Sequence, residues 1–102
     1  MAGYRLTPQA RIGLRNILEY VEGRFGAGVA ERVLDELEAA FERLAESPRI
    51  GHVREDITNN EQVLFWSVRP TLIAYRSVEN VIDVLFVERG ERDWERMLED
   101  EF

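Results

Sequence analysis

The stretch VIDVLFVERGERDW, residues 81–94, joins a strongly apolar, β-branched run to a glycine break and a charged cluster. Only Asp83 interrupts the apolar run between Val81 and Val87. A strand with one face in water alternates apolar and polar side chains, so this nearly continuous run predicts a strand that is covered on both faces. We expect helices on one face, and other parts of the chain or a partner on the second.

Gly90 ends this strand, and the residues after it predict a short acidic helix from Glu91 to Glu101. Trp94, Met97 and Leu98 recur in it at helical spacing. Ionisable residues therefore lie where the strand ends and the helix begins, at the rim of the predicted sheet, and this rim is the first candidate for a functional site. These residues are Glu88, Arg89, Glu91, Arg92 and Asp93.

Two more strands are predicted just before this stretch, at Val63–Val68 and Leu72–Arg76. Arg69-Pro70 forms the turn between them, and Val78–Asn80 forms the turn that follows. Strands joined by turns this short are antiparallel neighbours. A short alternating segment at Tyr4–Leu6 predicts an edge strand near the N-terminus.

Two amphipathic helices are predicted in the N-terminal half. Thr7 is the N-cap of the first and Pro8 its first residue, where the missing N–H of proline costs nothing. Gly26–Gly28 ends this helix, the second begins at about Val29, and Ser47–His52 closes it. The two apolar stripes consist of Ala10, Leu14, Ile17, Leu18, Val21 and Phe25, and of Ala30, Val33, Leu34, Leu37, Phe41 and Leu44.

These elements predict a single α+β domain over residues 1–102, in which an N-terminal two-helix hairpin packs on a small antiparallel sheet and a short C-terminal helix follows. We expect the other face of the sheet to carry Trp66 or Tyr75 together with Arg76, and to be left for another role. Ile12 and Tyr20 lie off the stripe of the first helix, so they are either partly buried at its edge or part of a docking face.

The composition favours a protein partner. The chain has 13 basic residues against 20 acidic ones, all of the basic ones are arginine, and the formal net charge is −7. Repulsion from phosphates works against general nucleic-acid binding, so direct DNA binding is not expected. The absence of cysteine removes thiol catalysis, disulfides and cysteine zinc sites. With no signal peptide and no apolar run long enough to cross a membrane, we expect a cytoplasmic protein.

Few side chains suit acid–base or nucleophilic chemistry. His52 is the only histidine, and no serine lies in a nucleophile or phosphate-binding motif, so neither a metal nor another cofactor is expected. What remains is a set of arginines on predicted loops, turns and strand ends. They can stabilise a phosphorane in RNA cleavage, bind carboxylates at a protein interface, or pair with neighbouring acids. The set consists of Arg54, Arg69, Arg76, Arg89 and Arg92.

Several short motifs occur together in a specific order and spacing. They are Leu6-Thr7-Pro8-Gln9-Ala10, then Leu14, Ile17 and Tyr20, then Phe41, Leu44, Pro48, Gly51, Arg54 and Asp56, then Leu72–Arg76, and finally Gly90–Trp94. In these motifs, and over nearly its whole length, the chain resembles toxins of the RelE/ParE superfamily from bacterial type II toxin-antitoxin systems. It is nearer to the ParE branch. The family fold, a helical hairpin on a small sheet, is the one predicted above.

The resemblance implies a non-enzymatic toxin that inhibits DNA gyrase by binding it and that a cognate ParD-like antitoxin neutralises. RelE-type cleavage relies on basic residues in the sheet and usually on a late tyrosine or histidine, whereas this chain has no lysine, and nothing after Tyr75 is tyrosine or histidine. The family often has histidine where this chain has Arg89, and a basic residue near Val63 or Leu64.

Two alternatives stay open beside gyrase inhibition. One is a ribosome-dependent mRNA endonuclease that uses Arg54, Arg76 and Arg89, and the other is a degenerate toxin that acts only as an antitoxin-binding corepressor. The residues predicted to bind the target are Arg54, Arg89, Arg92 and Trp94. The residues predicted to bind the antitoxin, as an amphipathic helix and an extended tail, are Ile12, Arg15, Tyr20, Trp66 and Arg76.

Overall fold

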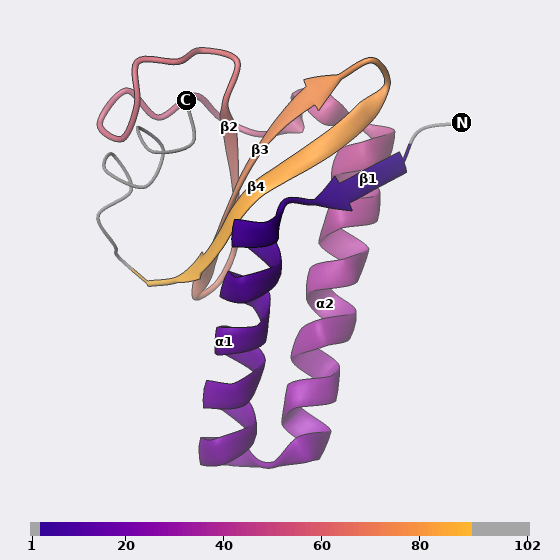
Figure 1. Cartoon of the computed structure of the whole chain (residues 1–102), viewed down its shortest axis with the longest axis vertical. Coiled ribbons are helices and arrows are strands. Elements are labelled where there is room, and N and C mark those ends of the chain that lie inside the picture. The colour runs from indigo at the N-terminus through magenta and orange to yellow at the C-terminus, as the bar shows by residue number, and fades with distance from the viewer. Residues whose placement is uncertain (1–2, 91–102) are drawn as a thin grey trace.

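The apolar run that begins at Val81 forms an inner strand of a four-stranded sheet with the order β1-β4-β3-β2. The computed structural model describes residues 3–90, and a two-helix hairpin packs on one face of the sheet (Figure 1). The elements are β1 (Gly3–Leu6), α1 (Pro8–Phe25), α2 (Ala27–Glu46), the 3-10 turn η1 (Pro48–Ile50), β2 (Leu64–Val68), β3 (Thr71–Val78) and β4 (Val81–Arg89). The α+β prediction is confirmed, and the predicted helix at Glu91–Glu101 lies outside the described residues.

The sheet is mixed rather than wholly antiparallel. β3 is antiparallel to β2 and to β4, as predicted, but β1 runs parallel to β4, from Gly3 opposite Val81 to Leu6 opposite Val84. The antiparallel prediction was wrong for this strand because β1 is remote from β4 in sequence, so no short turn fixes their relative direction. The two helices supply the long connection that a parallel pair requires.

Thr7 holds the junction between β1, α1 and β4. Its side chain accepts a hydrogen bond from the Ala10 N–H at 3.1 Å, as a helix N-cap does, and its hydroxyl donates to the carbonyl of Leu85 at 2.9 Å. Its backbone N–H donates to the carbonyl of Val84 at 3.0 Å. The start of α1 is therefore fixed directly to the inner strand.

β4 contains a β-bulge that explains its continuous apolar run. Ala74 pairs with Phe86 and Tyr75 with Val84, so Leu85 has no residue opposite it. Val84 packs in the core under the helices, whereas Leu85 and Phe86 both pack in a second core on the other face. Segments of the loop before β2 contribute Ile57 and Val63 to this second core. The prediction that both faces of the strand are covered is confirmed.

Gly13 sets the distance between α1 and the sheet. A Cβ atom at this position would lie 2.1 Å from the carbonyl oxygen of Val87, so only glycine allows the observed approach. Ile17 and Val21 continue the same buried stripe along α1. The helix rests on the backbone of β4 itself, without a layer of side chains between them at this point.

The hairpin link is shorter than predicted, because Gly26 alone separates α1 from α2. Its φ of 96° lies in the region that favours glycine, and it reverses the chain at once. Phe25, predicted to belong to the apolar stripe, is 60% exposed. Phe25 is the last residue of α1, at the tip of the hairpin, which extends beyond the sheet (Figure 1).

Tyr75 and Trp66 face the helices, which corrects the prediction that one of them lies on the opposite face. Tyr75 is fully buried; its hydroxyl donates to the carbonyl of Pro48 at 2.7 Å and accepts from the Gly51 N–H at 2.9 Å. Burial raises the pKa of the Tyr75 phenol above its ordinary value. Tyr75 and Arg76 are consecutive residues of β3, whose side chains alternate regularly, so they lie on opposite faces of the sheet. Trp66 pairs with Ile73, which also faces the helices.

Replacing Gly13 with alanine should destabilise the protein by about 1–3 kcal/mol, since the added methyl group meets backbone that cannot move independently. Gly23→Ala in the same helix is the matched control, because nothing lies within 4 Å of its Cβ position. That variant should gain up to about 1 kcal/mol from the higher helix propensity of alanine. Urea unfolding measures both, and equal stabilities would contradict the close contact.

Tyr75→Phe should cost about 1–3 kcal/mol at neutral pH, because the Gly51 N–H and the Pro48 carbonyl lose their partner. The pKa of Tyr75 is raised in the folded state, so its contribution is complete below the unfolded pKa of about 10 and is lost as the pH rises through the folded pKa. The chain has no lysine or cysteine, so tyrosines dominate this alkaline range.

The free energy of unfolding should therefore fall as the pH rises above about 10, and less steeply in the Tyr75→Phe variant. Tyr4, whose pKa is raised by burial and by Glu38 and Glu42, retains its share of the slope. Identical slopes for the two proteins would show that Tyr75 is not held as a neutral phenol.

Candidate protein-interaction surfaces

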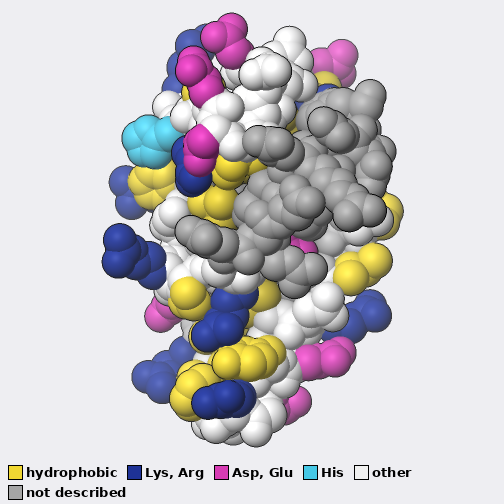
Figure 2. All heavy atoms as spheres, turned by 90° about the vertical axis from the view of Figure 1, so that its left-hand side faces the viewer, with side chains coloured by type: hydrophobic (Ala, Val, Ile, Leu, Met, Phe, Trp, Pro, Cys, Tyr) yellow, Lys and Arg dark blue, Asp and Glu magenta, His cyan; other side chains and the backbone are white. Residues whose placement is uncertain are grey.

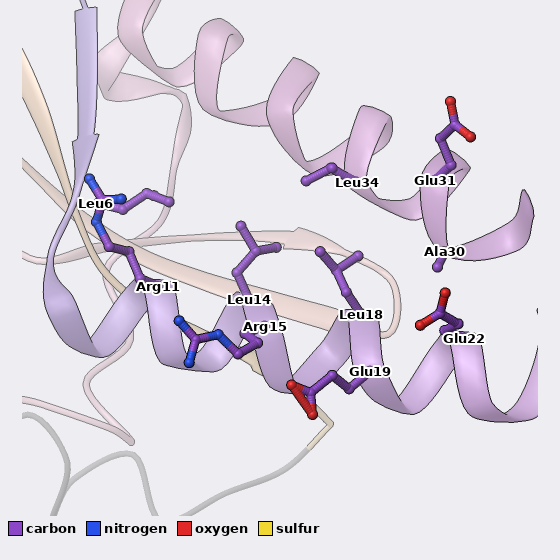
Figure 3. A pocket seen from close by; sticks show the side chains of 10 residues that line it. All are labelled: Leu6, Arg11, Leu14, Arg15, Leu18, Glu19, Glu22, Ala30, Glu31 and Leu34. Atoms are coloured by element: carbon purple, nitrogen blue, oxygen red, sulfur yellow. The ribbon is translucent and has the colours of Figure 1, made fainter. Parts of the chain in front are cut away.

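A groove of about 520 Å³ lies between α1 and α2 on the side of the hairpin away from the sheet (Figure 3). Leu14 and Leu18 point from α1 toward α2, and Leu34 points back from α2. Leu6 and Ala30 complete its apolar lining. We call this surface the α1–α2 groove. Its leucines are partly buried, so they are open to further contact with a partner.

Charged residues line the α1–α2 groove in two separate groups. Arg11 and Arg15 lie on the first half of α1, toward β1, whereas Glu19 and Glu22 lie nearer the tip of the hairpin. Glu31 joins the acidic end from α2. Within residues 3–90, none of these five side chains forms an ion pair. The groove therefore offers one basic and one acidic end around an apolar floor.

A second surface combines exposed aromatic and arginine side chains on α1 and at the end of β4. The guanidinium of Arg89 lies 4.3 Å from the ring centroid of Tyr20, and that of Arg24 lies 5.7 Å from the same centroid. Tyr20 and Ile12 are 40% and 48% exposed. Hydrophobic and basic side chains alternate over the lower part of this side of the molecule (Figure 2). We call the cluster of Tyr20, Arg24 and Arg89 the Tyr20 patch.

The sheet face opposite the helices carries a row of charges across three strands. Asp83 on β4 lies opposite Arg5 of β1 and Arg76 of β3. Its carboxylate oxygens lie 2.5 Å from Arg5 Nε and 3.9 Å from Arg76 Nε. The hydrogen bond and the charge of Asp83 raise the pKa of the Arg5 guanidinium. Arg76 therefore lies on this face, as predicted, beside an acid.

Arg54 lies in the loop before β2 and binds the side chain of Asp56. Its Nε and Nη2 atoms donate to the two carboxylate oxygens at 2.9 and 2.7 Å. These hydrogen bonds lower the pKa of Asp56. Any target that uses Arg54 must compete with this carboxylate or bind both side chains.

Trp66 lies on the helix side of β2, with the guanidinium of Arg43 and the ring of His52 as its neighbours. The guanidinium of Arg43 is 5.5 Å from its ring centroid, and the ring of His52 stacks at 6.4 Å with an interplanar angle of 20°. The backbone of His52 pairs with Phe65, which holds the histidine next to the strand. Trp66 is only partly accessible to a partner.

The predicted site residues do not form one surface. Ile12, Arg15 and Tyr20 are all exposed on α1, but Arg15 lines the α1–α2 groove and Tyr20 contacts Arg89. Trp66 and Arg76 lie on opposite faces of the sheet. The structure brings Tyr20 into contact with Arg89, although the two were predicted for different partners. Of the predicted target-binding residues, Arg92 and Trp94 lie outside the described residues. The assignment of these residues to partners stays a prediction.

The α1–α2 groove is the main surface that the sequence did not predict. Leu14, Leu18 and Leu34 were assigned to the apolar stripes and hence to the core, but they lie at the edges of those stripes. A usable signal was present in Arg11 and Arg15, which adjoin Leu14 and Leu18 on α1. Charged residues at the border of an apolar stripe indicate where the buried face ends.

No group of three or more histidine, cysteine, aspartate or glutamate side chains in residues 3–90 is arranged to hold a metal ion. No helix in the same range is long and apolar enough to span a membrane.

Comparison with known proteins gives one family match and one group of curated relatives. The family model described as "ParE toxin of type II toxin-antitoxin system, parDE" matches residues 4–94. The chain is similar to Toxin ParE1 of Mycobacterium tuberculosis, from strains CDC 1551 / Oshkosh and H37Rv. In each case the identity is 34% over 96 residues, which cover 93% of this chain and 96% of the relative.

Solved structures show the same fold. A chain of the chromosomal ParDE toxin-antitoxin system from P. aeruginosa matches with a TM-score of 0.72 at 18% identity, covering 89% of this chain and 97% of that one. The isolated E. coli RelE toxin matches with a TM-score of 0.57 at 17% identity, and each chain is covered completely. At such identities the structural likeness bears on the fold alone.

Proposed function

Because the chain belongs to the ParE family of toxins from type II toxin-antitoxin systems, we propose that it acts in the cytoplasm by binding and inhibiting DNA gyrase, without catalysis, and that a cognate ParD-like antitoxin neutralises it. The observation that carries the proposal is the family match over residues 4–94. The chain also has two exposed surfaces that combine apolar and charged side chains, the α1–α2 groove and the Tyr20 patch.

The antitoxin fits the α1–α2 groove. Leu14, Leu18 and Leu34 present apolar side chains on a surface that no other described part of the chain covers. An amphipathic helix buries such a floor through residues at three- and four-residue spacing. The family that the chain matches is described as the toxin of a type II toxin-antitoxin system, parDE, which supports an antitoxin partner for this chain.

The proposal of inhibition by binding is supported by the state of the candidate catalytic groups. His52 is exposed and stacked on Trp66, and Arg54 is bound to Asp56. The pKa of Tyr75 is raised by burial, and its hydroxyl is used in two structural hydrogen bonds. These groups are poorly placed to move protons to and from an RNA substrate.

We assign gyrase binding to the Tyr20 patch, which includes Arg89 from the predicted target set. Arginine and tyrosine are enriched among residues that dominate binding energy at interfaces. Tyr20 and Arg89 come from different elements and hold each other in place, so the patch is arranged before a target arrives. Its position at the end of β4 places it at the rim of the sheet.

Purified protein should inhibit supercoiling by purified gyrase, and Arg89→Ala should weaken this inhibition about tenfold, because a charge-assisted contact is lost. Arg32→Ala is the matched control, since Arg32 is exposed on α2 and lies outside both surfaces. Prior mixing with the antitoxin encoded beside the toxin gene should restore supercoiling.

Each alternative function gives a different result. Full supercoiling at a large toxin excess, with translation arrested and new messenger RNA ends mapped by primer extension, would indicate a ribosome-dependent endonuclease. Antitoxin binding without growth arrest on expression would indicate a corepressor. Either result would overturn gyrase inhibition while leaving the antitoxin interface to be tested separately.

A further inference from the structure

We propose that the α1–α2 groove selects its antitoxin segment by charge order as well as by apolar fit. It takes a helix that runs parallel to α1, with carboxylates in its first turn and basic residues in its last. The inference rests on the proposed antitoxin binding and adds to it the direction and the charge pattern of the bound segment.

The dimensions of the groove fit a short amphipathic helix. Arg11 and Glu22 lie eleven residues apart on α1, which corresponds to about 16 Å along the helix axis, or about three turns. Leu14 and Leu18 lie between them, with Leu34 opposite (Figure 3). A helix of similar length that places leucine-sized side chains on this floor brings its two ends beside the two charged groups.

The charge order along α1 opposes the stability of the helix itself. Arg11 and Arg15 are like charges at a four-residue spacing, and Glu19 and Glu22 are like charges at a three-residue spacing. Arg15 and Glu19 are opposite charges at a four-residue spacing, but in the weaker order, with the basic residue nearer the N-terminus. The basic pair is nearer the N-terminus and the acidic pair nearer the C-terminus, which is the reverse of the arrangement that a helix dipole favours. Helix stability therefore does not account for the pattern, whereas a partner with opposite charges compensates it.

Glu31 of α2 adds a third carboxylate to the acidic end of the α1–α2 groove. It lies at the tip end of the groove next to Ala30, toward which Glu22 points (Figure 3). The acidic end is therefore built from both walls of the groove, and the basic end from α1. Because none of these charges is paired within residues 3–90, a partner meets them unneutralised.

The direction follows from the partner's own helix dipole. Carboxylates over Arg11 and Arg15 stabilise a helix when they lie in its first turn, and basic residues over Glu19, Glu22 and Glu31 do so when they lie in its last turn. Both conditions hold only if the partner helix runs parallel to α1. Such a segment loses less free energy on ordering than one with the reverse pattern.

Two synthetic peptides of identical composition test the inference with the full-length toxin. Each is a capped 14-residue helix former with leucines on one stripe; one has two glutamates in its first turn and two arginines in its last, and the other has these exchanged. Fluorescence anisotropy should give a Kd for the first peptide at least tenfold lower than for the second.

A charge-exchanged toxin separates recognition from the intrinsic helicity of the peptides. Arg11→Glu, Arg15→Glu, Glu19→Arg and Glu22→Arg together keep the net charge of −7 and should invert the peptide preference. This variant should also have a higher Tm than the original chain, because its α1 then follows the dipole rule. Exchanging Arg32 and Asp35, which are exposed on α2 outside the groove, should leave the preference unchanged.

Four outcomes would overturn the inference. A tighter Kd for the second peptide would mean that the bound helix runs antiparallel to α1. If the charge-exchanged toxin prefers the same peptide as the original chain, the difference in Kd comes from the helicity of the peptides. Equal binding of both peptides that Leu18→Asp abolishes would leave the groove as the antitoxin site and remove only the charge rule. Binding of neither peptide would remove both, while gyrase inhibition remains independently measurable.

Discussion

The hydroxyl of Thr7 donates to the carbonyl of Leu85, and the relative positions of β1, α1 and β4 depend on this contact. Leu85 is the bulged residue of β4, so the hydrogen bond ties the helix start to the irregular point of the inner strand. The same bulge lets consecutive side chains of β4 enter both cores. This hydrogen bond thus fixes the helices against a strand that is apolar on both faces. On the face opposite the helices, the loop before β2 packs against the second core.

Much of this arrangement could be predicted from the sequence because its signals are local. The N-cap at Thr7, the turn at Val78–Asn80 and the apolar run of β4 each depend on neighbouring residues. The direction of β1 and the facing of Tyr75 could not be predicted in the same way. The first depends on a connection through two helices, and the second on which face of β3 the helices cover, because both faces of this strand carry apolar side chains.

The interaction surfaces were less accessible to sequence reasoning than the fold. Arg89 and Tyr20 were both singled out, but their contact joins residues far apart in the chain and appears only once α1 lies over β4. The leucines of the α1–α2 groove have the spacing of core residues, but they lie at the edges of the apolar stripes, on the side of the hairpin away from the sheet. Periodicity identifies an apolar stripe, but it does not say how much of that stripe a sheet of limited size can cover.

Gly13 has a consequence for how the molecule meets other proteins. Because α1 rests against the carbonyl of Val87 without an intervening side chain, it has no room to move toward the sheet when something presses into the groove above it. One wall of the binding surface is therefore a rigid template whose shape is the same before and after association. The conformational adjustment falls on the incoming segment, so variation in that segment, more than plasticity in this protein, decides which pairs form.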